Sequence, residues 1–145
     1  MALNLSDVRI YVDQDTHEIY EKLVSLAEKN AESHPFRTMK DLFVIAACIG
    51  SQQNKYVPLS TQKKEIFRGI IFRDKLDVPI LAALAYHKER DLSVLEDPRK
   101  IVDIAQGWAN GGIHLLQDEL LYQPGTPLLN WVNMLLDRQS SYDDQ

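Results

Sequence analysis

The chain has 145 residues, of which 45% are apolar and 26% are charged. This composition is typical of one globular domain and excludes a disordered, fibrous or membrane-embedded chain. The 16 basic and 21 acidic residues leave a formal net charge of -5, so overall charge does not draw the chain onto nucleic acid or an anionic membrane. Cys48 is the only cysteine, which excludes an intrachain disulfide. Because the first residues also carry no signal-peptide pattern, we expect a cytoplasmic protein.

The first third of the chain predicts a strand and a helix before the central segment. Residues 6–12 alternate apolar and polar side chains, the pattern of a half-buried strand. Asp15 stands three residues before Glu18 and gives the capping-box-like start of a helix that ends before Ser33. The apolar positions of this helix are Ile19, Leu23, Leu26 and Ala27.

A second capping box predicts the central helix. Thr38 precedes Asp41 by three residues, and residues 39–49 are then apolar on nearly every face up to Gly50, where we expect the helix to end. A helix that is apolar on all sides has to lie at the centre of the domain. Residues 50–59 are polar and turn-rich, which predicts a surface loop.

The second half predicts one more strand and three more helices. Residues 66–72 are β-branched and aromatic, which indicates a strand that pairs with residues 6–12. Three cap-and-proline signals then start helices, which we place at residues 77–88, 98–120 and 127–138. The predicted fold is therefore mainly α, a compact helical domain of about five helices with a small two-stranded β element. This domain covers residues 1–138, and residues 139–145 form an acidic flexible tail.

Three glycines stand close together on the predicted helix 98–120. We interpret Gly107, Gly111 and Gly112 as a small-residue patch on which a neighbouring helix packs, with Trp108 beside them in the core. A hinge, a close approach to a ligand, and a break of the helix at the last two glycines are the alternatives. The sequence has neither of the glycine-rich patterns that cradle phosphate groups, which argues against nucleotide hydrolysis.

Side chains that carry catalysis are sparse in this sequence. The histidines have no partner at the spacings that zinc sites on helices require, so we expect no metal and no cofactor. Cys48 lies among apolar residues, which predicts a buried, unreactive thiol. Glu65, Asp74 and Lys75 flank the predicted second strand and are the candidates for a metal-dependent nuclease. We expect a protein that is not an enzyme.

Residues 50–75 differ in charge from the rest of the chain. Their six basic and two acidic residues give a net charge of +4, whereas the remainder, with ten basic and nineteen acidic residues, has -9. This segment predicts a contact with duplex DNA or with a protein partner, and a solvated strand edge is the alternative. The candidate contact residues are Lys55, Lys63, Lys64, Arg68, Arg73 and Lys75.

The order of features in the middle of the chain resembles a known family. Phe-Arg-Thr-Met-Lys-Asp at residues 36–41 leads into the apolar helix that ends in Gly50, and the features that follow are Pro58-Leu59, Glu65-Ile66-Phe67 and a helix ending near Asp91-Leu92. Over residues 36–136 this pattern is similar to small proteins associated with bacterial DNA phosphorothioation (Dnd) gene clusters. In such defence systems DNA modification marks self, and partner proteins restrict unmarked invading DNA. The resemblance implies an accessory, non-enzymatic role beside larger DNA-acting partners, and it transfers no catalytic residue.

Three functions follow from these observations. The first is an assembly subunit that binds larger protein components of a DNA-defence complex, with Trp131 and Tyr122 as exposed candidate contacts. The second is a DNA-binding transcriptional regulator of winged-helix type, which would use residues 50–75 and an adjacent helix. The third is the metal-dependent nuclease.

Overall fold

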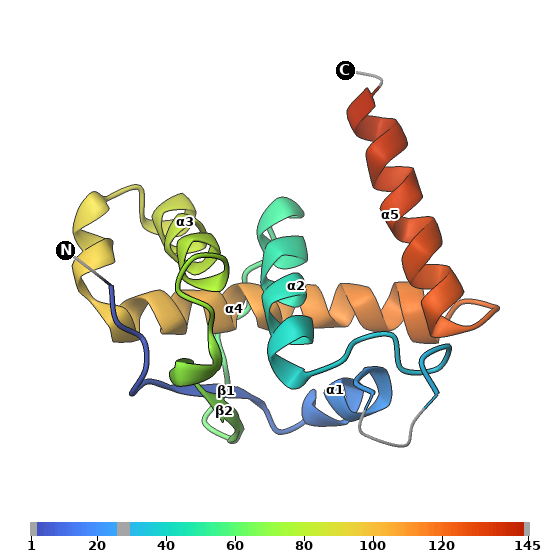
Figure 1. Ribbon diagram of the computed structural model, residues 1–145, viewed down its shortest axis with the longest axis horizontal. Coiled ribbons are helices and arrows are strands. Elements are labelled where there is room, and N and C mark those ends of the chain that lie inside the picture. The colour runs from blue at the N-terminus through green and yellow to red at the C-terminus, as the bar shows by residue number, and fades with distance from the viewer. Residues whose placement is uncertain (1–2, 26–29, 144–145) are drawn as a thin grey trace.

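The computed structural model describes residues 3–25 and 30–143, with side chains up to Ser140 (Figure 1). The described chain folds into five α-helices and one two-stranded antiparallel sheet, which confirms the predicted fold class. The strands are β1 (Arg9–Asp13) and β2 (Lys63–Arg68). The helices are α1 (His17–Leu23), α2 (Met39–Gln52), α3 (Asp77–Glu89), α4 (Pro98–Leu116) and α5 (Pro127–Asp143). Two 3-10 turns, η1 (Gly69–Ile71) and η2 (Leu92–Glu96), and a π-helical turn, η3 (Gln117–Leu121), complete the elements.

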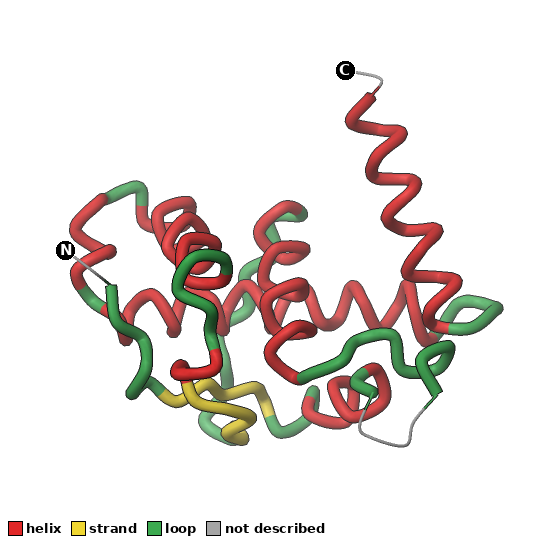
Figure 2. Tube along the Cα trace, in the orientation of Figure 1, coloured by secondary structure: helices red, strands yellow, loops and turns green. Residues whose placement is uncertain are grey.

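Helix α4 lies at the centre of the fold and contacts α2, α3 and β1. Figure 2 shows α2 crossing α4, with α3 above α4 and the sheet below it, while α5 rises from the C-terminal end of α4 and projects beyond the other helices. The core between these layers is apolar, and its largest fully buried side chains include Trp108, Tyr20, Phe43, Leu42 and Leu81. The indole N–H of Trp108 donates to the carbonyl of Leu84 at 3.2 Å, which ties α3 to α4.

The contact between α2 and α4 is the most extensive in the molecule, and it depends on glycine. A Cβ atom on Gly50 would stand 2.0 Å from the carbonyl oxygen of Trp108, and one on Gly112 would stand 1.8 Å from the carbonyl oxygen of Ala46. The two backbones therefore touch directly, since any larger side chain would push the helices apart. The predicted packing against a helix is confirmed for Gly112, whereas a Cβ on Gly107 would meet the ring of Tyr56 and one on Gly111 the carbonyl of Lys55, both in the loop after α2. Helix α4 runs unbroken through Gly111 and Gly112.

The sheet confirms the predicted pairing, but its second strand lies earlier than predicted. Strand β2 ends at Arg68, and residues 69–71 form η1 instead of continuing the predicted strand 66–72. The Gly69 amide donates to the carbonyl of Val8 at 2.8 Å, and its Cα packs against the carbonyl of Leu5, so the chain turns there. Ile70 and Ile71, whose β-branched side chains suggested a strand, are exposed.

Helix α1 is shorter than predicted and begins with a different cap. Its N-cap is Thr16 instead of Asp15, and the Thr16 hydroxyl donates to the carbonyl of Asp13 at 3.1 Å, so the predicted capping box does not form. The helix ends at Leu23 because Val24 forms a β-bridge with Phe36. The predicted apolar positions Leu26 and Ala27 lie outside the described residues.

The other helix starts follow the sequence signals, while two helix ends do not. The Thr38 hydroxyl accepts from the Asp41 amide at 3.1 Å, and Asp97 accepts from the Lys100 amide at 3.2 Å. Helix α2 continues past Gly50 to Gln52, because the glycine serves close packing and does not stop the helix. Helix α5 continues past Arg138 to Asp143, so residues 139–143 belong to this helix and not to a separate tail.

A buried ion pair joins the starts of α2 and α3. The ammonium of Lys40 lies 2.9 Å from Asp77 Oδ2 and 3.2 Å from Asp41 Oδ1. Asp77 Oδ2 also accepts from the Arg73 amide at 2.8 Å. Both side chains of the inner pair are almost fully buried, so each charge depends on the other for compensation.

We predict that Gly112→Ala destabilises the fold by about 2 to 3 kcal/mol, because the new methyl group forces α2 and α4 apart. Helix propensity alone would stabilise the same exchange by about 1 kcal/mol. Urea denaturation measures the free energy of unfolding. Ala83→Gly on the exposed side of α3 is the matched control and should destabilise by about 1 kcal/mol. A Gly112→Ala protein as stable as wild type would contradict the close contact.

We predict that Asp77→Ala destabilises the fold by about 3 kcal/mol, because it leaves the Lys40 ammonium buried with one partly exposed partner. Adding Lys40→Met to this variant should restore part of the loss, since the second change removes the buried charge. Thermal and urea unfolding of the single and double variants measure this difference. Asp74→Ala, which removes an exposed carboxylate three residues away, should change little. A double variant no more stable than Asp77→Ala would be evidence against the role of the pair.

Candidate functional site

Helix α5 is held at its base by hydrogen bonds to η3 and to the turn that follows it. The Asn130 amide group donates to the carbonyls of Leu120, at 3.2 Å, and Gln123, at 3.4 Å. The turn before the helix contains Gly125 at a φ of 101°, a conformation that favours glycine. Thr126 caps the first turn by accepting from the Leu129 amide at 3.3 Å. The direction of α5 is therefore set by the turn and by Asn130.

Farther along, aromatic and polar side chains of α5 contact the body. The ring of Trp131 packs against that of Phe36, with 5.2 Å between the centroids. The guanidinium of Arg138 donates to the side chain of Gln52 at the end of α2. These contacts hold the helix beside α2.

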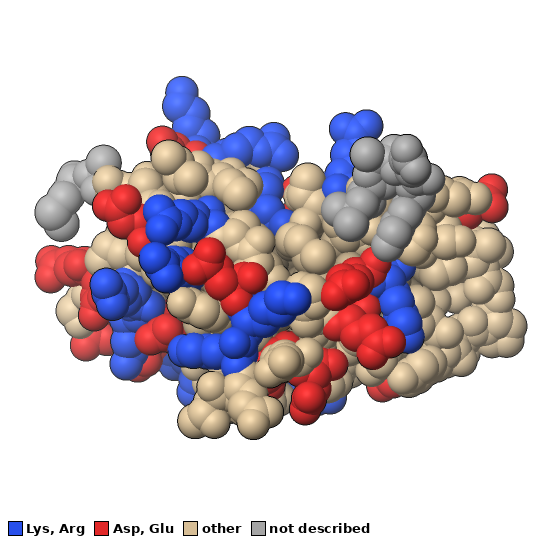
Figure 3. Space-filling model, turned by 90° about the horizontal axis from the view of Figure 1, so that it is seen from below, with Lys and Arg blue, Asp and Glu red and all other residues tan. Residues whose placement is uncertain are grey.

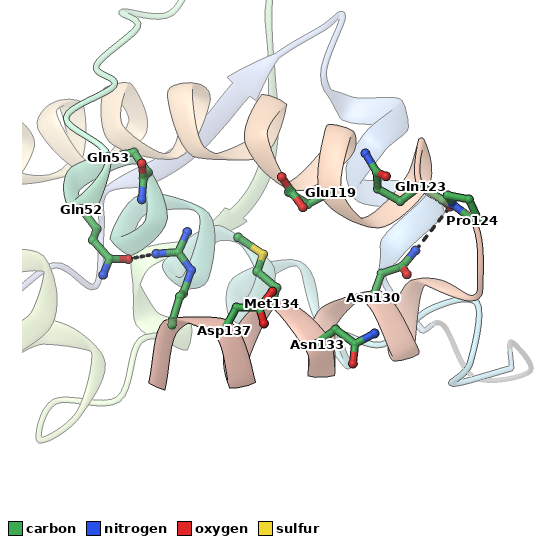
Figure 4. Close-up of a pocket in the computed structure, with 10 residues that line it drawn as sticks. Gln52, Gln53, Glu119, Gln123, Pro124, Asn130, Asn133, Met134 and Asp137 are labelled. Carbon is green, nitrogen blue, oxygen red and sulfur yellow. Dashed lines mark hydrogen bonds between the residues drawn. The ribbon is translucent and has the colours of Figure 1, made fainter. Parts of the chain in front are cut away.

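A polar groove of about 630 Å³ lies between α5, the end of α2 and η3 (Figure 4). Five of its lining residues carry carboxamide groups, so we call it the carboxamide groove: Gln52, Gln53, Gln123, Asn130 and Asn133. Glu119, Asp137 and Arg138 add charges, and Met134 supplies an apolar contact. Carboxamides both donate and accept hydrogen bonds, so this groove suits a ligand with alternating donors and acceptors, such as a peptide backbone.

The opposite side of α5 is apolar and faces solvent. Leu129 is 54% exposed, Val132 42%, Leu135 45% and Leu136 54%, and we call these four residues the α5 stripe. Helix α5 thus faces the body with a mixed side, on which Trp131 and Met134 pack against the core beside Asn130, and it leaves the stripe exposed. A surface helix usually has one apolar face, which covers the core, whereas α5 has a second apolar side that is exposed.

A second apolar surface continues from the stripe. A cleft of about 460 Å³ lies beside Trp131, and its lining includes Ile45, Ile80 and Leu76, of which Leu76 is 50% exposed. We call it the Trp131 cleft. Trp131 and Leu135 are four residues apart on α5, so the cleft and the stripe meet on the same side of this helix.

The basic residues predicted from the sequence are all exposed, but they do not form one continuous face. Lys63 lies over the ring of Tyr11, 4.9 Å from its centroid, and Arg73 lines the Trp131 cleft. Acidic side chains stand among them, and Figure 3 shows blue and red side chains interleaved on the side of the sheet. The structure thus disperses the local excess of positive charge that the sequence shows.

The arrangement of helices and strands differs from that of a winged helix. Helix α2 precedes β2 and would have to serve as the recognition helix, yet most of its residues are buried. Strand β2 pairs with β1 from the start of the chain, where a wing would require a hairpin after the recognition helix. A buried helix cannot enter the major groove of DNA.

The predicted nuclease residues are not gathered into a metal site. Glu65 lies 3.5 Å from the guanidinium of Arg9, across the sheet. Within residues 3–25 and 30–143 no group of three or more histidine, cysteine, aspartate or glutamate side chains is placed to hold a metal ion. His87 is instead engaged with its neighbours, since its ring lies 5.7 Å from that of Trp108.

The sequence predicts helix α5 but not the orientation of its apolar side. Tyr122 is 68% exposed, as predicted, and Trp108 is buried, also as predicted. Trp131 is half-buried against Phe36. The periodic leucines of α5 were visible in the sequence, and their spacing predicted a helix with an apolar face without indicating that this face is uncovered.

A family model described as DNA sulphur modification system-associated protein 4 matches residues 9–145. The chain belongs to this family. It is therefore a protein associated with DNA sulphur modification (Dnd) systems, which confirms the resemblance and extends it beyond residues 36–136 in both directions. No curated protein and no solved structure matches the chain. In the part of the chain that the structure describes, no helix is both long and apolar enough to cross a membrane.

We predict that Cys48 reacts slowly with thiol reagents. The residue is half-buried on α2, and burial raises the pKa of its thiol above the ordinary value, so less thiolate is present at neutral pH. Alkylation by iodoacetamide, followed by mass spectrometry, should be at least about tenfold slower than for an exposed cysteine placed at Ala83 in a Cys48→Ala background. Raising the pH should speed both reactions, and the rate for Cys48 should rise at a higher pH than the rate for the exposed cysteine. Equal rates in the folded proteins would show that Cys48 is freely accessible.

Proposed function

We propose that this Dnd-associated protein is a non-enzymatic accessory or assembly subunit of a DNA-phosphorothioation-linked antiphage restriction system, and that it acts by protein–protein binding through α5. The observation that carries the proposal is the exposed apolar stripe on α5, a helix whose other side already packs on the body. Its four stripe residues are each about half exposed, and covering the remaining surface of each contributes about 1 kcal/mol to an association. Contiguous exposed apolar surface of this kind marks interaction sites in soluble proteins.

Two further features support a protein as the ligand. The carboxamide groove lies along the other side of the same helix and offers hydrogen-bond donors and acceptors to a partner. Outside residues 50–75 the chain has a net charge of -9, which complements the basic surfaces of DNA-acting proteins. A larger DNA-acting component of the same system is therefore the partner we propose.

The proposal is tested by binding to the purified proteins encoded beside this chain in its Dnd cluster. We expect Leu136→Glu on the stripe or Asn133→Lys in the groove to lower the affinity for one of these proteins by about tenfold or more. Ala83→Glu on α3 is the matched control, because it adds a charge at an exposed position away from α5. Calorimetry measures the affinity, and phage plating on cells with the same variants measures restriction.

Two results would overturn the proposed function. One is that no protein of the system binds the chain, or that binding ignores both α5 variants. The other is turnover by the purified chain itself, such as cleavage of plasmid DNA with added Mg²⁺ or Mn²⁺, because the proposal assigns the chemistry to the partners.

A further inference from the structure

We propose that the α5 stripe is covered by the α5 stripe of a second copy of this chain, in an antiparallel pair about a twofold axis. This inference rests on the proposed function, in which α5 is the binding element, and it names the occupant of one of its two sides. The carboxamide groove would then face outward on both copies and remain free for the larger component.

The spacing of the stripe fits a helix partner. Leu129, Val132 and Leu136 follow one another at intervals of three and four residues, the spacing of a coiled-coil seam, and Leu135 flanks them. With 17 residues, α5 is about 25 Å long, so two such helices can pair over roughly two heptads. A groove for an extended peptide would need alternating pockets, which a convex helix face does not have.

Charge favours a copy of the same chain over an unlike partner. The four stripe residues are uncharged, and the charged residues Asp137 and Arg138 lie on the side of the groove. A twofold pair places the same surface on both sides of the interface. Charges on the stripe would therefore repel the same charges of the second copy, whereas an uncharged stripe can pack against its own copy. Unlike partners are usually selected by complementary charges at the seam, and the stripe offers none.

The ends of α5 favour the antiparallel direction. The helix has no acidic residue in its first turn and no basic residue in its last turn, the residue types that offset the helix dipole at those ends. In an antiparallel pair the positive N-terminal end of each helix lies beside the negative C-terminal end of the other. A parallel pair would bring like ends together.

The surface available is larger than one helix face. Specific dimers bury about 800 Å² on each partner, which four half-exposed side chains do not supply alone. The Trp131 cleft adjoins the stripe and adds Leu76, Ile80 and Ile45 to the apolar surface. The second copy therefore has the stripe and the apolar part of this cleft to cover, while Arg37, Asp41 and Arg73 line the same cleft and can pair with opposite charges across a twofold axis.

The test is the mass of the purified full chain in solution. We expect sedimentation equilibrium to give twice the 16.6 kDa of the chain at about 100 μM. Leu136→Glu should weaken self-association about 100-fold, because it places two carboxylates in the apolar seam. Asn133→Glu adds the same charge to the groove side of the same helix and should leave the mass unchanged. Circular dichroism confirms that both variants fold.

Cysteine pairing tests the direction, in a Cys48→Ala background. The middle of the stripe lies near Val132, so Val132→Cys should form a disulfide with its own copy. Leu129→Cys should not pair with itself but should pair with Leu136→Cys when the two proteins are mixed. Self-pairing at Leu129 would overturn the antiparallel arrangement.

A chain that stays monomeric at about 100 μM would overturn the dimer. If that monomer still binds a protein of the Dnd system, and Leu136→Glu abolishes this binding, the proposed function stands and the stripe binds the unlike partner. If the chain dimerises through the stripe but binds no protein of the system, the dimer stands and the proposed function fails.

Discussion

The backbone contact between α2 and α4 determines how the rest of the chain is arranged. Gly50 and Gly112 let each helix rest on the carbonyl groups of the other, so α2 is enclosed and α4 becomes the axis to which the other elements attach. The apolar sequence of α2 requires this position, because it has no side that water could cover at low cost. The Lys40–Asp77 pair then fixes the start of α3 against α2. These contacts among α2, α3 and α4 involve no residue of α5.

The position of α5 follows from the way α4 ends. The π-helical turn and Gly125 redirect the chain, and Asn130 fixes the first turn of α5 by bonding to two carbonyls of that connection. A polar residue has therefore been placed on the inward side of the helix, which rotates the leucines outward. The carboxamide groove and the α5 stripe are two results of this one rotation. Rotating α5 to bury its leucines would break the Asn130 bonds and the Trp131–Phe36 contact.

Local chemistry made much of the fold predictable. Thr38 and Asp97 cap their helices as their sequence positions indicate, and the alternation of Val8, Ile10 and Val12 located the first strand. The errors occur where a long-range contact overrides the local pattern. Gly50 predicts the end of a helix, but it is instead the residue at which α2 packs against the carbonyl of Trp108. Ile70 and Ile71 predict a strand, although the chain has already turned at Gly69. Such contacts join residues tens of positions apart, which no short pattern records.

The candidate site was less predictable for a related reason. In the sequence, six basic residues fall in one segment, residues 50–75. In the fold they are separated: Lys63 lies over Tyr11 on the sheet, Arg73 lines the Trp131 cleft, and acidic side chains stand among them. Helical periodicity predicts that α5 has an apolar side, but it does not indicate what covers that side. That depends on the few bonds at the base of the helix. In an ordinary surface helix the body covers the apolar side; here Asn130, Trp131 and Met134 face the body, and the four stripe residues on the other side stay exposed, as interaction surfaces do.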